Sequence, residues 1–314
     1  MRFLRKIAIM LAAFLLVMGG LQAYTLPADT TVRKSKVKKQ EPLSMLDRGF
    51  DFIIGAGIYF GGRYSAGYYS GIPENENNLN YIFDNYYRKQ EIVDLIVKNN
   101  NFVSRYDSTI AIKEYPSKMR YSPALSISLG FSYKFTKNWG LTFTYSFARL
   151  VAKDVFSVGY QAISGNEHND YLLYNLVGKE NRSFFDLSVR YLFQPSGIVK
   201  PFLEFGVQFN YVKVKYFKAI IEGEEFELLD WYRGQNYVPG VDMQKFNIIY
   251  GGPGFGFSAA AGLKIVCNKV ISVDPVFYVS VSKLGLKGYN SFDKHSINYG
   301  AYIRFVMNDS FFAR

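Results

Sequence analysis

The stretch ALSISLGFSYKFTKNWGLTFTYSF, residues 124–147, alternates large and small side chains on both sides of a break at 136–140. One set of alternate positions holds large aliphatic and aromatic residues: Leu125, Ile127, Leu129, Phe131, Tyr133 and Phe135, then Leu141, Phe143, Tyr145 and Phe147. The positions between them are mostly Ser, Thr and Gly. Because successive side chains of a strand point to opposite faces, this pattern predicts two strands, each with one apolar face.

A strand with one apolar face fits two architectures. In a soluble sandwich, the apolar face packs against a second sheet. In a membrane barrel, the apolar face contacts lipid and the other face lines a polar interior. The local pattern does not distinguish a soluble sandwich from a membrane barrel, so the distinction depends on the rest of the chain.

The N-terminal residues predict export. MRFLRK is positively charged, and the apolar run IAIMLAAFLLVMGG that follows has the length of a signal-peptide core, with a small residue at Ala23. We therefore expect a cleaved signal peptide at 1–23. An N-terminal membrane anchor is the alternative, but the run is short for a spanning helix. Residues 24–47 lack periodicity and are rich in Lys and Arg, which predicts a basic periplasmic linker.

The composition favours a membrane barrel. Aromatic residues make up 18% of the chain, and its only cysteine is Cys267, so a disulfide framework is excluded. Abundant Tyr and Phe are typical of the aromatic girdles of outer-membrane barrels. The formal net charge is +11, but many of the basic residues lie in the first 48 positions. We expect no nucleic-acid partner.

The alternation recurs often enough to count strands. Eight segments carry it: 50–61, 124–135, 141–147, 183–193, a segment starting at 201, 255–266, 270–283 and 297–307. Each is close to the 9–11 residues, roughly, that a tilted membrane strand needs. An even number of strands places both chain ends on the same side of the barrel.

The connections between these segments alternate in length. Those at 136–140, 194–200 and 267–269 are short, those at 64–120, 150–182 and 218–254 are long, and 284–296 is intermediate. Short turns on one side and long loops on the other are typical of transmembrane barrels. The predicted fold is all-β, an eight-stranded transmembrane antiparallel up-and-down barrel over 48–307. A C-terminal tail at 308–314 follows it.

The inward positions predict a paired polar network. If Tyr191 faces Leu203 across the turn at 194–200, Arg190 faces Glu204, and Asp186 likewise faces Gln208. Lys264 is expected diagonal to Asp274. The predicted interior network comprises Lys134, Asp186, Arg190, Glu204, Gln208, Lys264, Asp274 and Arg304. Because buried charges need partners and eight strands enclose only side chains, we expect a filled interior.

The segment YKFTKNWGL, residues 133–141, resembles a periplasmic turn of small Gram-negative outer-membrane β-barrels. That superfamily includes the OmpA N-terminal barrel, OmpX, OmpW and the opacity-type porin-family proteins. The resemblance covers about 48–307. It implies outer-membrane lipid and the barrel assembly machinery as partners. It also implies interfacial aromatic residues, here Tyr133, Phe135, Trp139, Phe193 and Phe305.

The chain departs from this family pattern in two places. The family usually ends on an aromatic residue that closes the last strand, but here Phe305 is followed by VMNDSFFAR. Either Phe311 and Phe312 supply that signal or the strand ends early. The first long loop should hold structure of its own, with a helix predicted at 81–98. A short hairpin is also possible at 221–226.

Sites for chemistry are weak in this sequence. GFGFSA at 254–259 matches a dinucleotide fingerprint, but a period-2 strand follows it rather than a helix. The only two histidines, His168 and His295, fall in predicted loops far apart, a weak signal for zinc or catalysis. We expect no catalytic residue, no cofactor and no metal.

Three functions remain open. Tyr- and Asn-rich loops favour a non-enzymatic barrel whose extracellular loops contact an unknown ligand or partner, or which supports the envelope. Porin-like passage of small solutes is the alternative, because charges of both signs and glycines point inward. An outer-membrane enzyme acting on lipid or peptide is the third hypothesis.

Overall fold

The computed structural model describes residues 49–100, 103, 110–160, 171–193, 197–287, 289 and 295–309. All of them belong to one unit, Pro42–Arg314. The predicted signal peptide, the predicted linker, His168 and the last residues from 310 onward lie outside the described residues. Among the residues described, no helix is both long and apolar enough to cross a bilayer.

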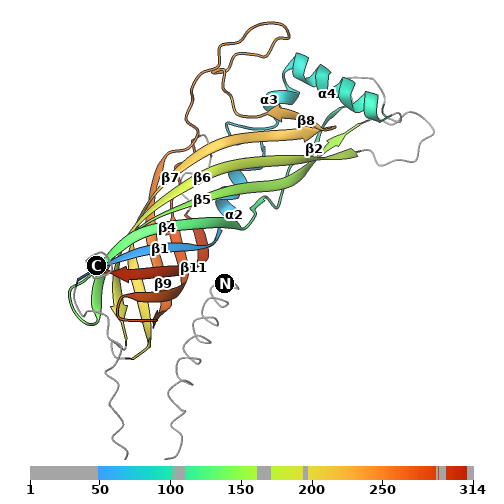
Figure 1. Cartoon of the computed structure of the whole chain (residues 1–314). Coiled ribbons are helices and arrows are strands. Elements are labelled where there is room, and N and C mark those ends of the chain that lie inside the picture. The colour runs from blue at the N-terminus through green and yellow to red at the C-terminus, as the bar shows by residue number, and fades with distance from the viewer. Residues whose placement is uncertain are drawn as a thin grey trace, which may run out of the picture. The chain divides into compact units, whose positions relative to one another are not determined.

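Eight antiparallel strands of the described residues close into a ring (Figure 1). They are β1 (Gly49–Phe60), β4 (Ala124–Lys134), β5 (Trp139–Gly159), β6 (Tyr171–Leu192), β7 (Val199–Ile221), β9 (Pro253–Val266), β10 (Ile271–Ser282) and β11 (Ser296–Asn308). Each strand pairs with the next around the ring, and β1 pairs with β11 to close it. The predicted eight-stranded up-and-down barrel is confirmed.

The large residues of the opening stretch lie on the outside of the barrel. Leu125 is 73% exposed, whereas Ser126 and Ser128 beside it are buried. Outward-facing residues that stand opposite one another on β5, β6 and β7 form rows, and five successive rows are largely apolar and define the apolar band. These rows are Trp139–Tyr191–Leu203, Leu141–Val189–Phe205, Phe143–Leu187–Val207, Tyr145–Phe185–Phe209 and Phe147–Ser183–Tyr211.

The height of the apolar band matches a membrane. At about 3.3 Å per residue and a tilt of about 45°, the steps from Trp139 to Phe147 cover about 20 Å. Transmembrane barrels carry an outward apolar band roughly 25 Å tall. The band is therefore close to the thickness that lipid would cover.

Three strands run well beyond the apolar band, which corrects the predicted loops. Residues 150–159 belong to β5, 171–182 to β6 and 218–221 to β7, although all were expected in long connections. These strand ends form a curved sheet, here called the extension (Figure 1). The alternation continues there with opposite sense, because the apolar residues, such as Phe156 and Leu176, now lie on the inner face and are buried.

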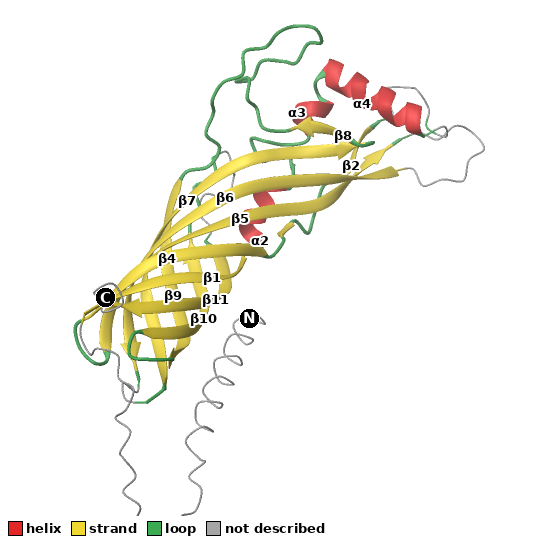
Figure 2. Cartoon of the chain, viewed as in Figure 1, coloured by secondary structure: helices red, strands yellow, loops and turns green. Residues whose placement is uncertain are grey.

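The extension has its own hydrophobic core. Two helices, α3 (Asn80–Phe83) and α4 (Tyr86–Asn99), lie at its far end beside β8 (Glu224–Glu227) and β2 (Ala111–Glu114), as Figure 2 shows. Buried residues of α4 belong to the same apolar cluster as residues on the inner face of the extension. This part of the chain is a folded structure held beyond the barrel.

The helix predicted at 81–98 is present, but it is broken in two. Asn85 begins α4, and its side chain accepts a hydrogen bond from the backbone N–H of Arg88 at 3.0 Å. Such a cap satisfies a free N–H at the start of a new helix. The predicted hairpin at 221–226 is also present. Positive φ angles at Glu222 and Gly223 are those of the tight turns that join hairpin strands.

Two short helical turns lie nearer the barrel. They are α2 (Arg63–Ala66) and a 3-10 turn at Gly67–Tyr69, which directly follow β1. The remaining short strand, β3 (Arg120–Tyr121), pairs with β5 at Lys153 and Ala152. These segments place side chains at the mouth of the barrel, on the side of the extension.

Candidate functional site: the barrel interior and its mouth

The interior near the short turns holds a ladder of ion pairs. Arg190 of β6 lies 2.6 Å from Oε1 of Glu204 on β7 and 3.2 Å from Oδ2 of Asp274 on β10. Arg304 of β11 lies 2.8 Å from Oε2 of Glu204. All four side chains are buried. The ladder therefore ties four strands together across the lumen, and its register places Arg190 opposite Glu204.

A second cluster contains a residue that sequence reasoning missed. Asp51 of β1 lies 3.1 Å from Nζ of Lys134 and 3.4 Å from Nζ of Lys264. Lys264 was expected diagonal to Asp274; its ammonium group pairs with Asp51, and the Asp274 carboxylate pairs with Arg190. Asp51 stands at an inward position of its strand, between Phe50 and Phe52, so the alternation carried the signal that could have found it.

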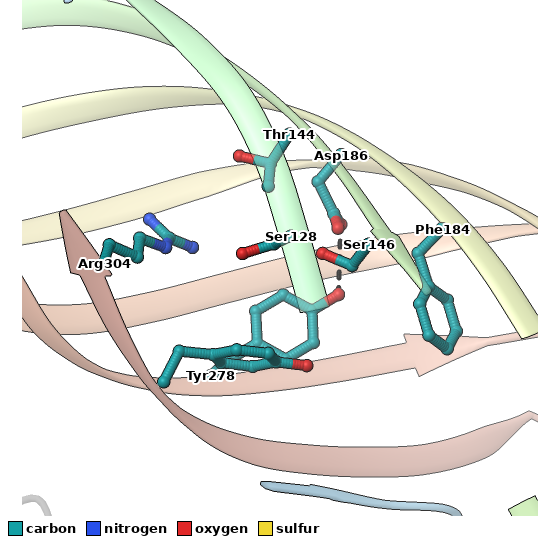
Figure 3. Close-up of a pocket in the computed structure, with 8 residues that line it drawn as sticks. Ser128, Thr144, Ser146, Phe184, Asp186, Tyr278 and Arg304 are labelled. Atoms are coloured by element: carbon teal, nitrogen blue, oxygen red, sulfur yellow. Dashed lines mark hydrogen bonds between the residues drawn. The ribbon is translucent and has the colours of Figure 1, made fainter. Parts of the chain in front are cut away.

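Midway along the barrel, polar side chains fill the lumen around Asp186. Its carboxylate accepts hydrogen bonds from Nε2 of Gln208 at 3.2 Å and from the Tyr278 hydroxyl at 3.0 Å. A cavity of about 10 Å³ lies here, lined by Ser128, Thr144, Ser146, Phe184, Asp186, Tyr278, Tyr302 and Arg304 (Figure 3). That is room for about one water molecule.

The mouth of the barrel holds a buried ion pair and the residues that bind it. Arg182 pairs with Glu180, and both side chains are 0% exposed. Arg182 also donates to Oδ1 of Asn298 at 3.2 Å and to Oγ of Ser65 at 3.0 Å. We call these residues, with the two tyrosines described next, the mouth cluster: Ser65, Tyr69, Tyr121, Glu180, Arg182 and Asn298.

Two tyrosines complete the mouth cluster. The hydroxyls of Tyr69 and Tyr121 donate to Oε2 of Glu180 at 2.7 and 3.1 Å. The Tyr69 ring lies directly on Gly178, where an added Cβ would sit only 2.1 Å from the ring. The segment after β1 is therefore fastened into the mouth. Glu180 and Arg182 escaped sequence reasoning because they fell in a predicted loop, although they have the same parity as Asp186 and Arg190.

The predicted interfacial aromatics all lie on the outer surface. Tyr133, Phe135, Trp139, Phe193 and Phe305 are between 43% and 52% exposed. The rings of Trp139 and Tyr191 lie 4.7 Å apart between centroids, and the rings of Phe50 and Tyr133 lie 4.8 Å apart. They gather toward the short-turn end of the barrel, where a lipid–water interface would lie.

The weak chemical motifs end in plain structural positions. GFGFSA begins β9 and continues as strand, so the helix that a dinucleotide site needs is not there. His295 is exposed just before β11, and Cys267 is an exposed free thiol. Among the described residues, no three His, Cys, Asp or Glu side chains gather as a metal site.

Ionisable groups at the far end of the extension are perturbed by burial. Burial raises the pKa of Glu227 above its ordinary value, although its carboxylate accepts hydrogen bonds from the backbone N–H of Phe217 and Leu229. Burial, reinforced by the charge of Asp230, raises the pKa of Tyr81 to about 12.

Several solved structures resemble this chain. Neisserial surface protein A is 9% identical over 82% of this chain and 96% of its own, with a TM-score of 0.35. The outer membrane protein OprG from Pseudomonas aeruginosa is 9% identical over 85% and 97%, with a TM-score of 0.34. Ail, the attachment invasion locus protein of Yersinia pestis, is 9% identical over 83% and 98%, with a TM-score of 0.31.

No protein-family model matches the chain, and no curated protein matches its sequence. At TM-scores this low, the assignment of the fold depends on the strand pairing of the chain itself. On that pairing, the chain is an eight-stranded antiparallel up-and-down β-barrel with an apolar outer band.

Proposed function

We propose that this chain is an integral outer-membrane β-barrel without enzymatic activity. Its barrel is closed to solutes, and its work is done by the extension, which it displays outside the cell as a contact surface. The observation that carries the proposal is the combination of a filled lumen with three strands that continue into a folded structure. A barrel that served only as an anchor or a pore would not need such a structure.

The orientation follows from the lengths of the connections. The short turns lie at the end of the barrel opposite the extension, and long connections lie on the extension side. In outer-membrane barrels short turns face the periplasm and longer segments face outward. The predicted signal peptide accords with this, because it would deliver the chain across the inner membrane.

The far end of the extension offers surface for a partner. Tyr86 and Tyr87 of α4 are 68% and 44% exposed, and their rings contact each other edge to face at 5.5 Å. A groove of about 410 Å³ lies beside Tyr87, Leu95 and Pro239. Tyr offers large contact area at low entropic cost, so a protein or glycan partner would find its anchors here.

Closure is tested by a liposome-swelling assay with a small sugar, using refolded protein whose gel mobility shifts on boiling. We expect no swelling above that of protein-free liposomes. Sugar entry would overturn closure and favour porin-like passage instead.

The contact role is tested by attachment of producing cells to surfaces coated with matrix protein, serum protein or cells of the same strain. Tyr86→Ser with Tyr87→Ser should reduce attachment to at least one surface, because it removes the exposed anchors. Lys287→Gln is the control for an exposed change elsewhere. Attachment that is equal for both variants and the unaltered chain would overturn the role of α4.

A further inference from the structure

The outer face of the extension changes character abruptly where the apolar band ends. The last apolar row is Phe147–Ser183–Tyr211, and the next outward row is Arg149–Asn181–Lys213. In the second row beyond the apolar band, Lys179 of β6 stands opposite Tyr216 of β7. The third row begins with Lys153 of β5, and Arg120 of β3 stands opposite Lys153 on the other side of β5. We call this surface the basic patch: Arg120, Arg149, Lys153, Lys179, Lys213 and Lys215.

The patch is positive and close to contiguous. Five of its six residues are exposed and Lys179 is half-buried. Neighbouring strands lie about 4.8 Å apart and alternate residues about 6.6 Å apart, so these cations share an area roughly 15 Å across. None of the outward positions in these three rows of β5, β6 and β7 carries a carboxylate. The third row continues through Lys218 to Glu227 of β8, and Lys218 pairs with Glu225. The field is therefore of one sign in the rows nearer the apolar band, and such a field attracts anions.

The height of the patch identifies its partner. Successive outward rows of a strand tilted by about 45° differ in height by about 5 Å. The polar headgroup region of one leaflet is about 5–8 Å thick. The row of Arg149 and Lys213 therefore lies about 5 Å above the last apolar row, among the headgroups. Lys179 and Lys153 lie about 10 and 15 Å above that row, beyond the headgroups but within about a Debye length of them. The patch also continues directly from the apolar band on the same strands.

We propose that the basic patch binds the phosphate groups of lipids in the leaflet that surrounds the extension side of the barrel. Lys and Arg that lie just beyond a membrane's apolar core are attracted to anionic lipid, and Arg can bind phosphate with two parallel hydrogen bonds. The inference rests on the proposed membrane location and orientation. It adds that the extension is held against the bilayer on one side, which fixes how its far end is presented.

The test measures lipid binding to the folded, full-length barrel in neutral detergent by native mass spectrometry. The probes are lipid A, a phosphorylated glycolipid, the same lipid after removal of its phosphates, and inorganic phosphate. The test variant is Lys153→Gln, Lys179→Gln and Lys213→Gln together. The matched control removes three exposed lysines outside the patch: Lys245→Gln, Lys269→Gln and Lys287→Gln.

We expect the unaltered chain and the control to bind the phosphorylated lipid equally, and the dephosphorylated lipid weakly. Each lysine near an anionic surface contributes about five-fold, so the test variant should bind roughly 100-fold more weakly. Binding should also fall with added salt, because exposed charges are screened. Equal loss in test and control variants, or no preference for the phosphorylated lipid, would overturn the proposal.

Inorganic phosphate separates lipid from a free anion. Binding of phosphate alone as strong as that of the lipid would overturn the lipid assignment. Failure of the heat-modifiable barrel to form would count against the proposed function itself, whereas a folded barrel with unchanged lipid binding would count only against the patch.

Discussion

Replacement of Arg182 by methionine tests the mouth cluster most severely. The change removes the cation but keeps much of the side-chain volume, so it leaves the Glu180 carboxylate buried without its ion-pair partner. Glu180 would retain only the hydroxyls of Tyr69 and Tyr121. Breaking a buried pair by removal of one partner costs about 3–5 kcal/mol. The free energy of unfolding should fall by about that amount.

The double variant Arg182→Met with Glu180→Gln provides the control. It removes both charges, and the amide still accepts hydrogen bonds from the tyrosines, so the cost should be smaller by about 2–3 kcal/mol. The assay is urea unfolding of the folded barrel in lipid vesicles, followed by tryptophan fluorescence and gel mobility. The reasoning would be refuted if Arg182→Met alone lowered the free energy of unfolding by less than about 1 kcal/mol. It would also be refuted if the effects of Arg182→Met and Glu180→Gln on that free energy were additive.

Three further predictions concern other parts of the chain. Leu187→Arg, in the middle row of the apolar band, should lower the free energy of unfolding in lipid by about 2–4 kcal/mol. Asn175→Arg on the extension should change it very little, and equal effects of the two variants would show that the apolar band is assigned to the wrong residues. Gly178→Val should displace Tyr69 and make the mouth accessible to a water-soluble quencher, and unchanged accessibility would contradict the close packing seen there. Because the pKa of Glu227 is raised in the folded state, the folded chain binds more protons, so the stability of the extension should fall as pH rises through that pKa; Glu227→Gln should remove this part of the pH dependence in hydrogen exchange.

The barrel was predictable from sequence because its physics is local. A strand in lipid must show an apolar side chain at every second position, and 124–147 does so almost without exception. The register of the β6–β7 pair followed from the turn at 194–200, and Arg190 stands opposite Glu204 as expected. Asp51 and Lys264 show the limit, since contacts across the lumen join strands that no turn connects.

The extension could not be predicted from the same alternation, because its outer face no longer contacts the apolar core of a membrane. Beyond Ala148 the outer face leaves the apolar core of the membrane and is polar, while the inner face is buried, farther along in the same apolar cluster as α3 and α4. The apolar set therefore moves from odd to even positions in β5. When the alternation of apolar and polar residues changes sense within one strand, sequence analysis mistakes the second half of the strand for a loop. The packing of α4 against β7 depends on contacts between residues more than 100 positions apart in sequence, which no local pattern encodes.

The central claim is that the barrel is closed, and single-channel conductance across a planar bilayer tests it most directly. The sample should be refolded protein that shows heat-modifiable gel mobility, with the Arg182→Met variant measured alongside it. We expect no steady conductance from the unaltered chain, because ion pairs fill the lumen and the mouth cluster lies across its outer end. Reproducible conductance steps from the unaltered chain would contradict it.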